Sequence, residues 1–191
     1  IGVLSFLKDD IDKAIESFTH SIFLNQDART YNDRASCYRY LDENKQAIED
    51  YLVAIDLKPD LAFIYNNLAS TYRKIGDTSN ALYYYNLAID KDENYLLAYN
   101  NRGSLFIDLN DFQKAVNDID VALSLDDNYA PAYNNKGIIF HKRKQYFEAL
   151  SNFDKAISLK NDYGKAYLNR GITRQMIRDE DGACNDWQKA T

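Results

Sequence analysis

Several residue types are scarce in this 191-residue chain, and each scarcity excludes a class of protein. Only two cysteines are present, Cys37 and Cys184, so we expect no disulfide framework. The two histidines, His20 and His141, lie in distant parts of the chain, so we expect no shared metal site. No apolar run approaches the roughly 18 residues that a membrane-spanning helix needs. Two prolines and seven glycines are too few for long irregular linkers.

Sequence motifs for catalysis and phosphate binding are also missing. The chain has no phosphate-binding loop and no G-x-S-x-G, H-E-x-x-H or C-x-x-C motif. Its net charge of −6 argues against nucleic acid and anionic membranes, which favour a basic surface. We therefore expect no enzyme, catalytic residue, cofactor or metal, and we expect a cytoplasmic location. The chain begins with Ile1 rather than Met, which indicates a piece of a longer protein.

What the chain does have is a 34-residue period. Three Tyr-Asn-Asn triplets begin at Tyr65, Tyr99 and Tyr133, each 34 residues after the last. A column of small residues recurs at Ala35, Ala69, Gly103, Gly137 and Gly171. A column of large residues recurs at Tyr51, Tyr85, Ile119, Phe153 and Trp187. Such a period predicts stacked copies of one module, because a single copy cannot bury its apolar face alone.

The spacing inside each copy is helical. Tyr99, Gly103 and Phe106 stand at i, i+4 and i+7, which predicts two amphipathic helices of about 14 residues per copy. Small residues let the two helices approach closely, and we expect large residues of the neighbouring copy to fill the space beside them. Polar residues just before the first helices are expected to be N-caps: Asp60, Asn94, Asn128 and Asp162. The predicted copies are a partial one at 1–27, then 28–61, 62–95, 96–129, 130–163 and 164–191.

These columns resemble the tetratricopeptide repeat (TPR) family over nearly the whole chain. The resemblance implies an all-α solenoid of antiparallel helix pairs in a right-handed superhelix, with the first helices lining an inner groove. It also implies a module that binds other proteins. The closing segment, residues 178–190, is similar to the last repeat of many small bacterial proteins of the family.

Two columns of polar residues change together from copy to copy. On the first helices one column reads Arg34, Leu68, Arg102, Lys136 and Arg170. Sixteen residues later, on the second helices, the other reads Asp50, Tyr84, Asp118, Asn152 and Asp186. Because Arg accompanies Asp, Leu accompanies Tyr and Lys accompanies Asn, we interpret the columns as facing partners. The planar fork of Arg suits a partly buried carboxylate, so structural ion pairs are predicted for Arg34 with Asp50, Arg102 with Asp118, and Arg170 with Asp186.

Asparagines occupy two further columns in the middle of the first helices, where their helix propensity is poor. The first column contains Asn32, Asn66, Asn100 and Asn134. The second contains Asp33, Asn67, Asn101, Asn135 and Asn169. One interpretation is a contact in which each amide bonds the adjacent repeat. The other, which the resemblance favours, is a row of donors and acceptors in the groove that binds the backbone of a peptide.

Neighbouring groove positions are mostly basic. They include Arg39, Arg73 and Lys165 in a chain whose overall charge is negative. We therefore expect the groove to bind an extended or helical segment of another protein, with a preference for an acidic one. The alternatives are self-association through exposed repeat ends, including a homodimer, and a regulatory segment of a larger protein. A clamp for a partner's C-terminal carboxylate, as in some relatives, is not expected because only Lys165 matches its cations.

Overall fold

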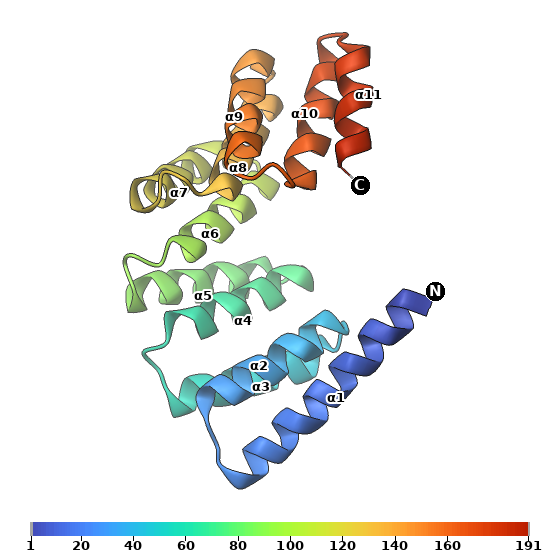
Figure 1. Cartoon of the computed structure of the whole chain (residues 1–191). Coiled ribbons are helices and arrows are strands. Elements are labelled where there is room, and N and C mark those ends of the chain that lie inside the picture. The colour runs from blue at the N-terminus through green and yellow to red at the C-terminus, as the bar shows by residue number, and fades with distance from the viewer. Residues whose placement is uncertain (1, 191) are drawn as a thin grey trace. The chain divides into compact units, whose positions relative to one another are not determined.

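The structure is a computed structural model that describes residues 2–190, with side chains from Asp10 onward. Over residues 2–190 it contains eleven α-helices and no strand (Figure 1). Their bounds are α1 Gly2–Leu24, α2 Ala28–Tyr40, α3 Asn44–Leu57, α4 Ala62–Lys74, α5 Thr78–Lys91, α6 Leu96–Asp108, α7 Phe112–Leu125, α8 Ala130–Lys142, α9 Tyr146–Leu159, α10 Gly164–Met176 and α11 Glu180–Lys189. The chain is all-α and built of antiparallel helix pairs.

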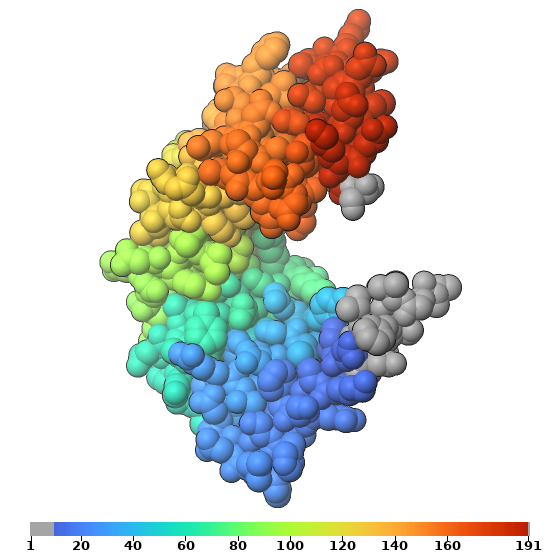
Figure 2. Space-filling model, in the orientation of Figure 1, coloured from blue at the N-terminus to red at the C-terminus, as the bar shows by residue number. Residues whose placement is uncertain are grey.

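The helices form two compact units, the first ending at Ala98 and the second beginning at Tyr99, within α6. In the first unit α2 pairs with α3 and α4 with α5, and α1 packs on α2. In the second unit α8 pairs with α9 and α10 with α11. Figure 2 shows that the side chains of successive helix pairs form a continuous surface within each unit.

The N-terminal segment differs from the other copies because α1 is one uninterrupted helix. In each complete copy a residue with positive φ separates the first helix from the second: Asp42, Gly76, Asn110, Lys144 and Arg178. Such a residue stops a right-handed helix, and α1 continues through the corresponding part of the chain. The expected register of Gly2 lies outside the described side chains, as do the outer ends of the predicted copies at Ile1 and Thr191.

Small residues face large ones across each helix pair. A Cβ atom added to Gly137 of α8 would lie 2.5 Å from Cε1 of Phe153 on α9. The same addition at Gly171 would lie 2.5 Å from Nε1 of Trp187 on α11. In both cases the large residue belongs to the same copy, so our expectation that the neighbouring copy supplies it was wrong at these glycines, whereas Ala156 of α9 does pack with Tyr167 of the next copy. The reason is that the two helices of one pair run closest where the glycine has no side chain.

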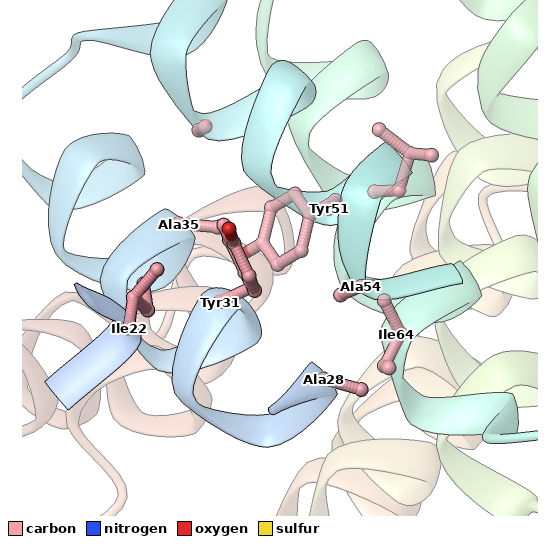
Figure 3. Packing of buried hydrophobic residues seen from close by; sticks show 9 residues of the cluster. Ile22, Ala28, Tyr31, Ala35, Tyr51, Ala54 and Ile64 are labelled. Carbon is pink, nitrogen blue, oxygen red and sulfur yellow. The ribbon is translucent and has the colours of Figure 1, made fainter. Parts of the chain in front are cut away.

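Each unit buries its own apolar clusters. In the first unit, Tyr31 of α2 and Tyr51 of α3 pack with Ala35, and Ile22 of α1 closes one side (Figure 3). The hydroxyl of Tyr51 bonds the hydroxyl of Ser36 at 3.0 Å, which satisfies its polar end inside the core. Burial raises the pKa of Tyr51 above its usual value.

The predicted N-caps of three first helices were wrong. Those helices are preceded by Leu61, Tyr129 and Tyr163, one position later, and none of these accepts a side-chain cap bond. Side-chain caps occur on α2, where Asp27 accepts from the backbone N–H groups of Arg29 and Thr30, and on three second helices, where Asp77, Asp111 and Asp179 accept backbone N–H groups. An N-cap aspartate satisfies donors that would otherwise be orphaned, so these turns are where the polar residues are needed.

Candidate functional site

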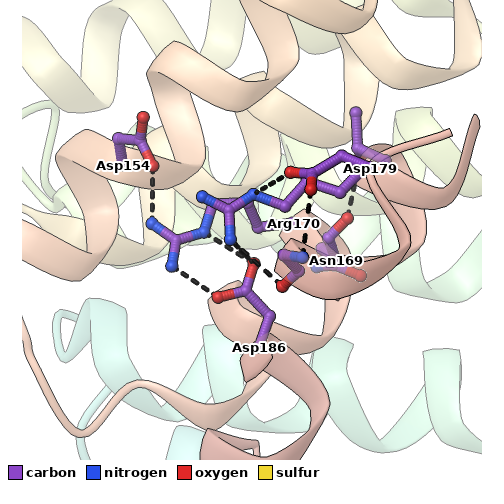
Figure 4. A network of polar contacts seen from close by, with 8 residues as sticks. Asp154, Asn169, Arg170, Asp179 and Asp186 are labelled. Atoms are coloured by element: carbon purple, nitrogen blue, oxygen red, sulfur yellow. Dashed lines mark hydrogen bonds and ion pairs between the residues drawn. The ribbon is translucent and has the colours of Figure 1, made fainter. Parts of the chain in front are cut away.

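The three predicted Arg–Asp pairs are brought together across their helix pairs. Arg102 on α6 donates from Nε and Nη2 to the two carboxylate oxygens of Asp118 on α7, at 2.8 and 2.7 Å. Arg34 meets Asp50 in the same two-bonded way at 2.7 and 2.8 Å. Arg170 and Asp186 repeat the arrangement on α10 and α11 (Figure 4). These mostly buried forks fix the spacing of first and second helices.

Two cations of this column, Arg170 and Lys136, also contact the preceding copy, which the sequence analysis missed. Nη1 of Arg170 lies 2.6 Å from Oδ1 of Asp154 on α9. Nζ of Lys136 lies 2.8 Å from Oδ1 of Asp120 on α7. Lys136 therefore does not meet Asn152, contrary to our expectation, because a point charge gains more from the nearby carboxylate than from an amide. Hydrogen bonding to Asp186 raises the pKa of Arg170, so this charge is permanent.

The asparagine columns form a ladder between successive first helices. Nδ2 of Asn67 on α4 donates to Oδ1 of Asn32 on α2 at 2.9 Å. In the second unit Asn135 donates to Asn100, and Asn169 donates to Asn134, each at 2.9 Å. The first-column residues, Asn32, Asn66, Asn100 and Asn134, are only 4–6% exposed. These hydrogen bonds join adjacent repeats, which is the first of the two interpretations that the sequence left open for the asparagine columns.

The other candidate groove residues are more accessible. Of the second column, Asn67, Asn101 and Asn169 are half-buried, whereas Asn135 is buried. Arg39 and Arg73 are half-buried and Lys165 is exposed. The amide ladder thus holds the first helices side by side, and the residues around it form the accessible face.

A hollow lies between α8 and α10 in the second unit, and we call it the apolar hollow. Its volume is about 110 Å³. It is lined by Ile138, His141, Lys142, Phe153, Asn169 and Ile172. Phe153 is fully buried at its floor and contributes only carbon atoms. The hollow can therefore receive an apolar group.

A second hollow lies at the same register in the first unit, and we call it the basic hollow. It has a volume of about 270 Å³ and is lined by Ser36, Arg39, Tyr40 and Lys74. Ser36, Arg39 and Tyr40 stand three copies before Ile138, His141 and Lys142. Nζ of Lys74 donates to the backbone oxygen of Arg39 at 2.6 Å and pairs with Oδ1 of Asp42 at 2.5 Å, so among the described side chains Arg39 is the lining cation without a carboxylate partner of this kind. The same place in the fold is thus polar and cationic in one unit and apolar in the other.

His141 is held in a defined orientation at the rim of the apolar hollow. Thr173 donates its hydroxyl hydrogen to the backbone oxygen of Asn169 at 2.8 Å. Its oxygen lies 2.9 Å from Nδ1 of His141 and must accept there, so Nδ1 carries the proton of the neutral ring. Burial, and then the charge of Lys142, lower the pKa of His141. The ring is therefore neutral near neutral pH.

The residues of the apolar hollow were not identified from the sequence. One signal was available: the column Ser36, Ser70 and Ser104 changes to Ile138 and Ile172 in the last two copies. In the first unit the serines bond tyrosines of the large column, as Ser70 does with Tyr85 at 3.0 Å. Where Phe153 replaces tyrosine, that hydroxyl partner is gone and isoleucine takes the place of serine. The two changes together mark an apolar floor and wall.

The described side chains also bear on metal binding, thiol chemistry and membrane insertion. Over its described side chains, no group of three or more His, Cys, Asp or Glu residues is placed to hold a metal ion. Cys37 and Cys184 are free thiols, and burial raises the pKa of Cys37. Among the helices of residues 2–190, none is both long and apolar enough to cross a membrane.

The fold and its ladder of first-helix contacts define the class of helical-repeat scaffolds, whose generally non-catalytic modules bind other proteins. A family model described as "Tetratricopeptide repeat" matches residues 64–95, 96–129 and 130–163, and one described as "TPR repeat" matches residues 36–76. The chain belongs to the tetratricopeptide repeat family. A comparison with curated proteins gave no match.

Solved structures share the fold. A tetratricopeptide repeat protein from Parabacteroides merdae is 24% identical with a TM-score of 0.76, over 95% of this chain and 73% of that one. MamA is 24% identical with a TM-score of 0.65, over 85% of this chain and 89% of that one. YrrB, described as a TPR protein with an unusual peptide-binding site, is 22% identical with a TM-score of 0.63. That match covers 92% of this chain and 91% of YrrB.

Proposed function

We propose that this chain is a scaffold or adaptor that binds an extended or helical segment of a partner protein on the exposed face of its first helices. The observation that carries the proposal is the pair of hollows at one register, each between successive first helices. Packing slots repeat from copy to copy, whereas the residues lining these hollows differ. A surface of this kind is suited to distinguishing one partner side chain from another.

The proposal assigns roles to the candidate residues. Arg39, Arg73 and Lys165 supply positive charge that favours an acidic partner, although exposed charges contribute only about 0–1 kcal/mol each. The half-buried amides Asn67, Asn101 and Asn169 have the chemistry to bond a peptide backbone beside the ladder. YrrB, a structural relative, is itself described as having a peptide-binding site, which supports a similar use here. A reducing cytoplasm suits the two free thiols.

The test is an unbiased selection of displayed random peptides against the whole chain. A photoreactive residue in each selected peptide is then cross-linked, and mass spectrometry locates the attachment. Attachment to α2, α4, α8 or α10 supports the proposal, whereas attachment confined to second helices refutes it. A variant with Arg39→Glu and Arg73→Glu should lose acidic peptides selected on the first unit, and Lys45→Glu on α3 is the matched charge control.

Self-association is the second candidate, favoured by apolar residues on α10. Leu168 is 46% exposed and Met176 is 53% exposed, more than a fully packed helix would leave. Light scattering over a concentration series tests it directly. A mass that rises with concentration and falls in Leu168→Lys supports a dimer, and a constant monomer mass excludes it.

A further inference from the structure

We propose that the apolar hollow is an anchor site for an aliphatic side chain of an acidic partner segment, such as Leu, Ile or Met flanked by Asp or Glu. This inference rests on the proposed function and specifies which partner segment the second unit selects. The size of the hollow, the chemistry of its lining and the charge around it all favour such a segment.

The size selects aliphatic groups over aromatic ones. A cavity of about 150 Å³ is known to accommodate benzene and to stay dry when it is lined by apolar groups. The apolar hollow has about 110 Å³, which is smaller than that cavity, and it is open to solvent on one side, so we expect it to enclose a compact aliphatic group more fully than a phenyl ring. A branched chain of four carbons fits this space, and the floor of Phe153 and the walls of Ile138 and Ile172 provide its contacts.

The lining lacks the polar partner found at the equivalent place in the first unit. There, the hydroxyls of Tyr51 on α3 and Ser36 on α2 bond each other at 3.0 Å. In the fourth complete copy Phe153 and Ile138 occupy these two slots, and neither has a hydroxyl. Ile172 is left 39% exposed at the edge of the hollow. An apolar side chain placed here would remove this surface from water, and Phe153, Ile138 and Ile172 carry no side-chain polar group that it would leave unsatisfied.

The surroundings of the hollow are locally positive. His141, Lys142, Arg143 and Lys144 are consecutive at the end of α8. Among the described side chains, Lys142, Arg143 and Lys144 form no ion pair, and Arg143 lies over the ring of Phe112 instead. The unit as a whole has thirteen basic and thirteen acidic residues from Tyr99 to Thr191, so this run is a local excess.

Acidic groups on the adjoining elements do not cancel this excess. Glu148 in the first turn of α9 accepts from Gln145, and both are exposed. Asp179 caps α11 and pairs with Arg174. Carboxylates on either side of an apolar anchor would therefore meet Lys142 and its neighbours, which favours an acidic partner over a basic one.

The experiment uses nuclear magnetic resonance on the whole chain labelled with nitrogen-15. The probes are short synthetic peptides with one central Leu between aspartates. Matched peptides carry Ala or Trp at the centre, or lysines in place of the aspartates. We expect the Leu–Asp peptide to shift the amide signals of Ile138, His141 and Ile172. The Ala peptide should bind about tenfold more weakly, since most of the buried apolar group is lost. The Trp and Lys peptides should shift these signals less at equal concentration.

Two variants connect the binding to the hollow. Ile172→Trp places a large side chain at a half-exposed position and should abolish the Leu-dependent shifts. Lys142→Glu, at an exposed position, should weaken binding of the aspartate peptide and strengthen that of the lysine peptide. Lys45→Glu in the first unit is the control and should change neither.

The outcomes separate this inference from the proposed function. Equal binding of the Leu, Ala and Trp peptides, or unchanged binding by both hollow variants, overturns the anchor site. If displayed peptides still cross-link to first helices in that case, the proposed function stands without the anchor. If no peptide reaches the first helices of either unit, both proposals fail.

Discussion

The ion pair of Arg102 and Asp118 allows the sharpest prediction on stability. Both side chains are mostly buried and are joined by two short hydrogen bonds. Removing one partner leaves the other charge in a poorly hydrated site, which typically costs about 3–5 kcal/mol. For a chain of this size the melting temperature should fall by about 6–20 °C in Asp118→Ala. Arg102→Leu alone should give a comparable loss.

The protein contains its own apolar replacement for this pair. In the second complete copy Leu68 and Tyr84 occupy the two slots, with Leu68 fully buried. The ring of Tyr84 stacks on Tyr72 with centroids 5.4 Å apart. Replacing a buried ion pair by well-packed apolar residues is often neutral or stabilising.

The double variant Arg102→Leu/Asp118→Tyr should therefore be much closer to the parent protein than either single variant. Phe106 stands where Tyr72 does, so the new tyrosine gains an aromatic partner. Thermal and urea unfolding followed by far-ultraviolet circular dichroism measures all three variants. A double variant as unstable as the sum of the single ones would refute the reasoning, as would an Asp118→Ala variant that melts like the parent.

Three further predictions follow from the same geometry. Gly137→Ala should destabilise by about 1–3 kcal/mol because its Cβ collides with Phe153, and the urea midpoint should recover when Phe153→Leu is added. Asn135→Ala should lower the free energy of unfolding by about 1–3 kcal/mol, because the buried amide oxygen of Asn100 loses its donor. Amide hydrogen exchange near Asn100 should become faster in this variant, and unchanged exchange would count against the ladder. The pKa of His141 is lower in the folded chain, so the stability that this group contributes is complete above its unfolded pKa of about 6.5 and is lost as pH falls through its folded pKa. The variant His141→Gln should therefore show a smaller change of melting temperature with pH between about pH 7 and 5. A variant whose melting temperature depends on pH as the parent's does would contradict this.

The repeat pattern was enough to predict the helix pairs and the facing residues within them. Each Arg–Asp pair could be predicted because both partners varied together at a spacing of 16 residues. Contacts from Arg170 to Asp154, and from Lys136 to Asp120, could not be predicted in this way because they join different copies. Their geometry depends on how one helix pair leans on the next, which a column of residues does not specify.

The candidate site was harder to predict for a related reason. A mid-helix asparagine has the same sequence signature whether it bonds a ligand or a neighbouring helix. Burial of Asn100 and its bond from Asn135 distinguish these uses only once the helices are placed. The apolar hollow depends on the space left between Phe153 and Ile172, which the periodicity of the sequence does not specify.

The most direct test of the account is to measure where peptides from an unbiased selection become cross-linked to the whole chain. The account predicts photo-cross-links to residues on α2, α4, α8 and α10, including the walls of the two hollows. Cross-links confined to α3, α5, α7, α9 and α11 would contradict it, because the partner would then occupy the second helices.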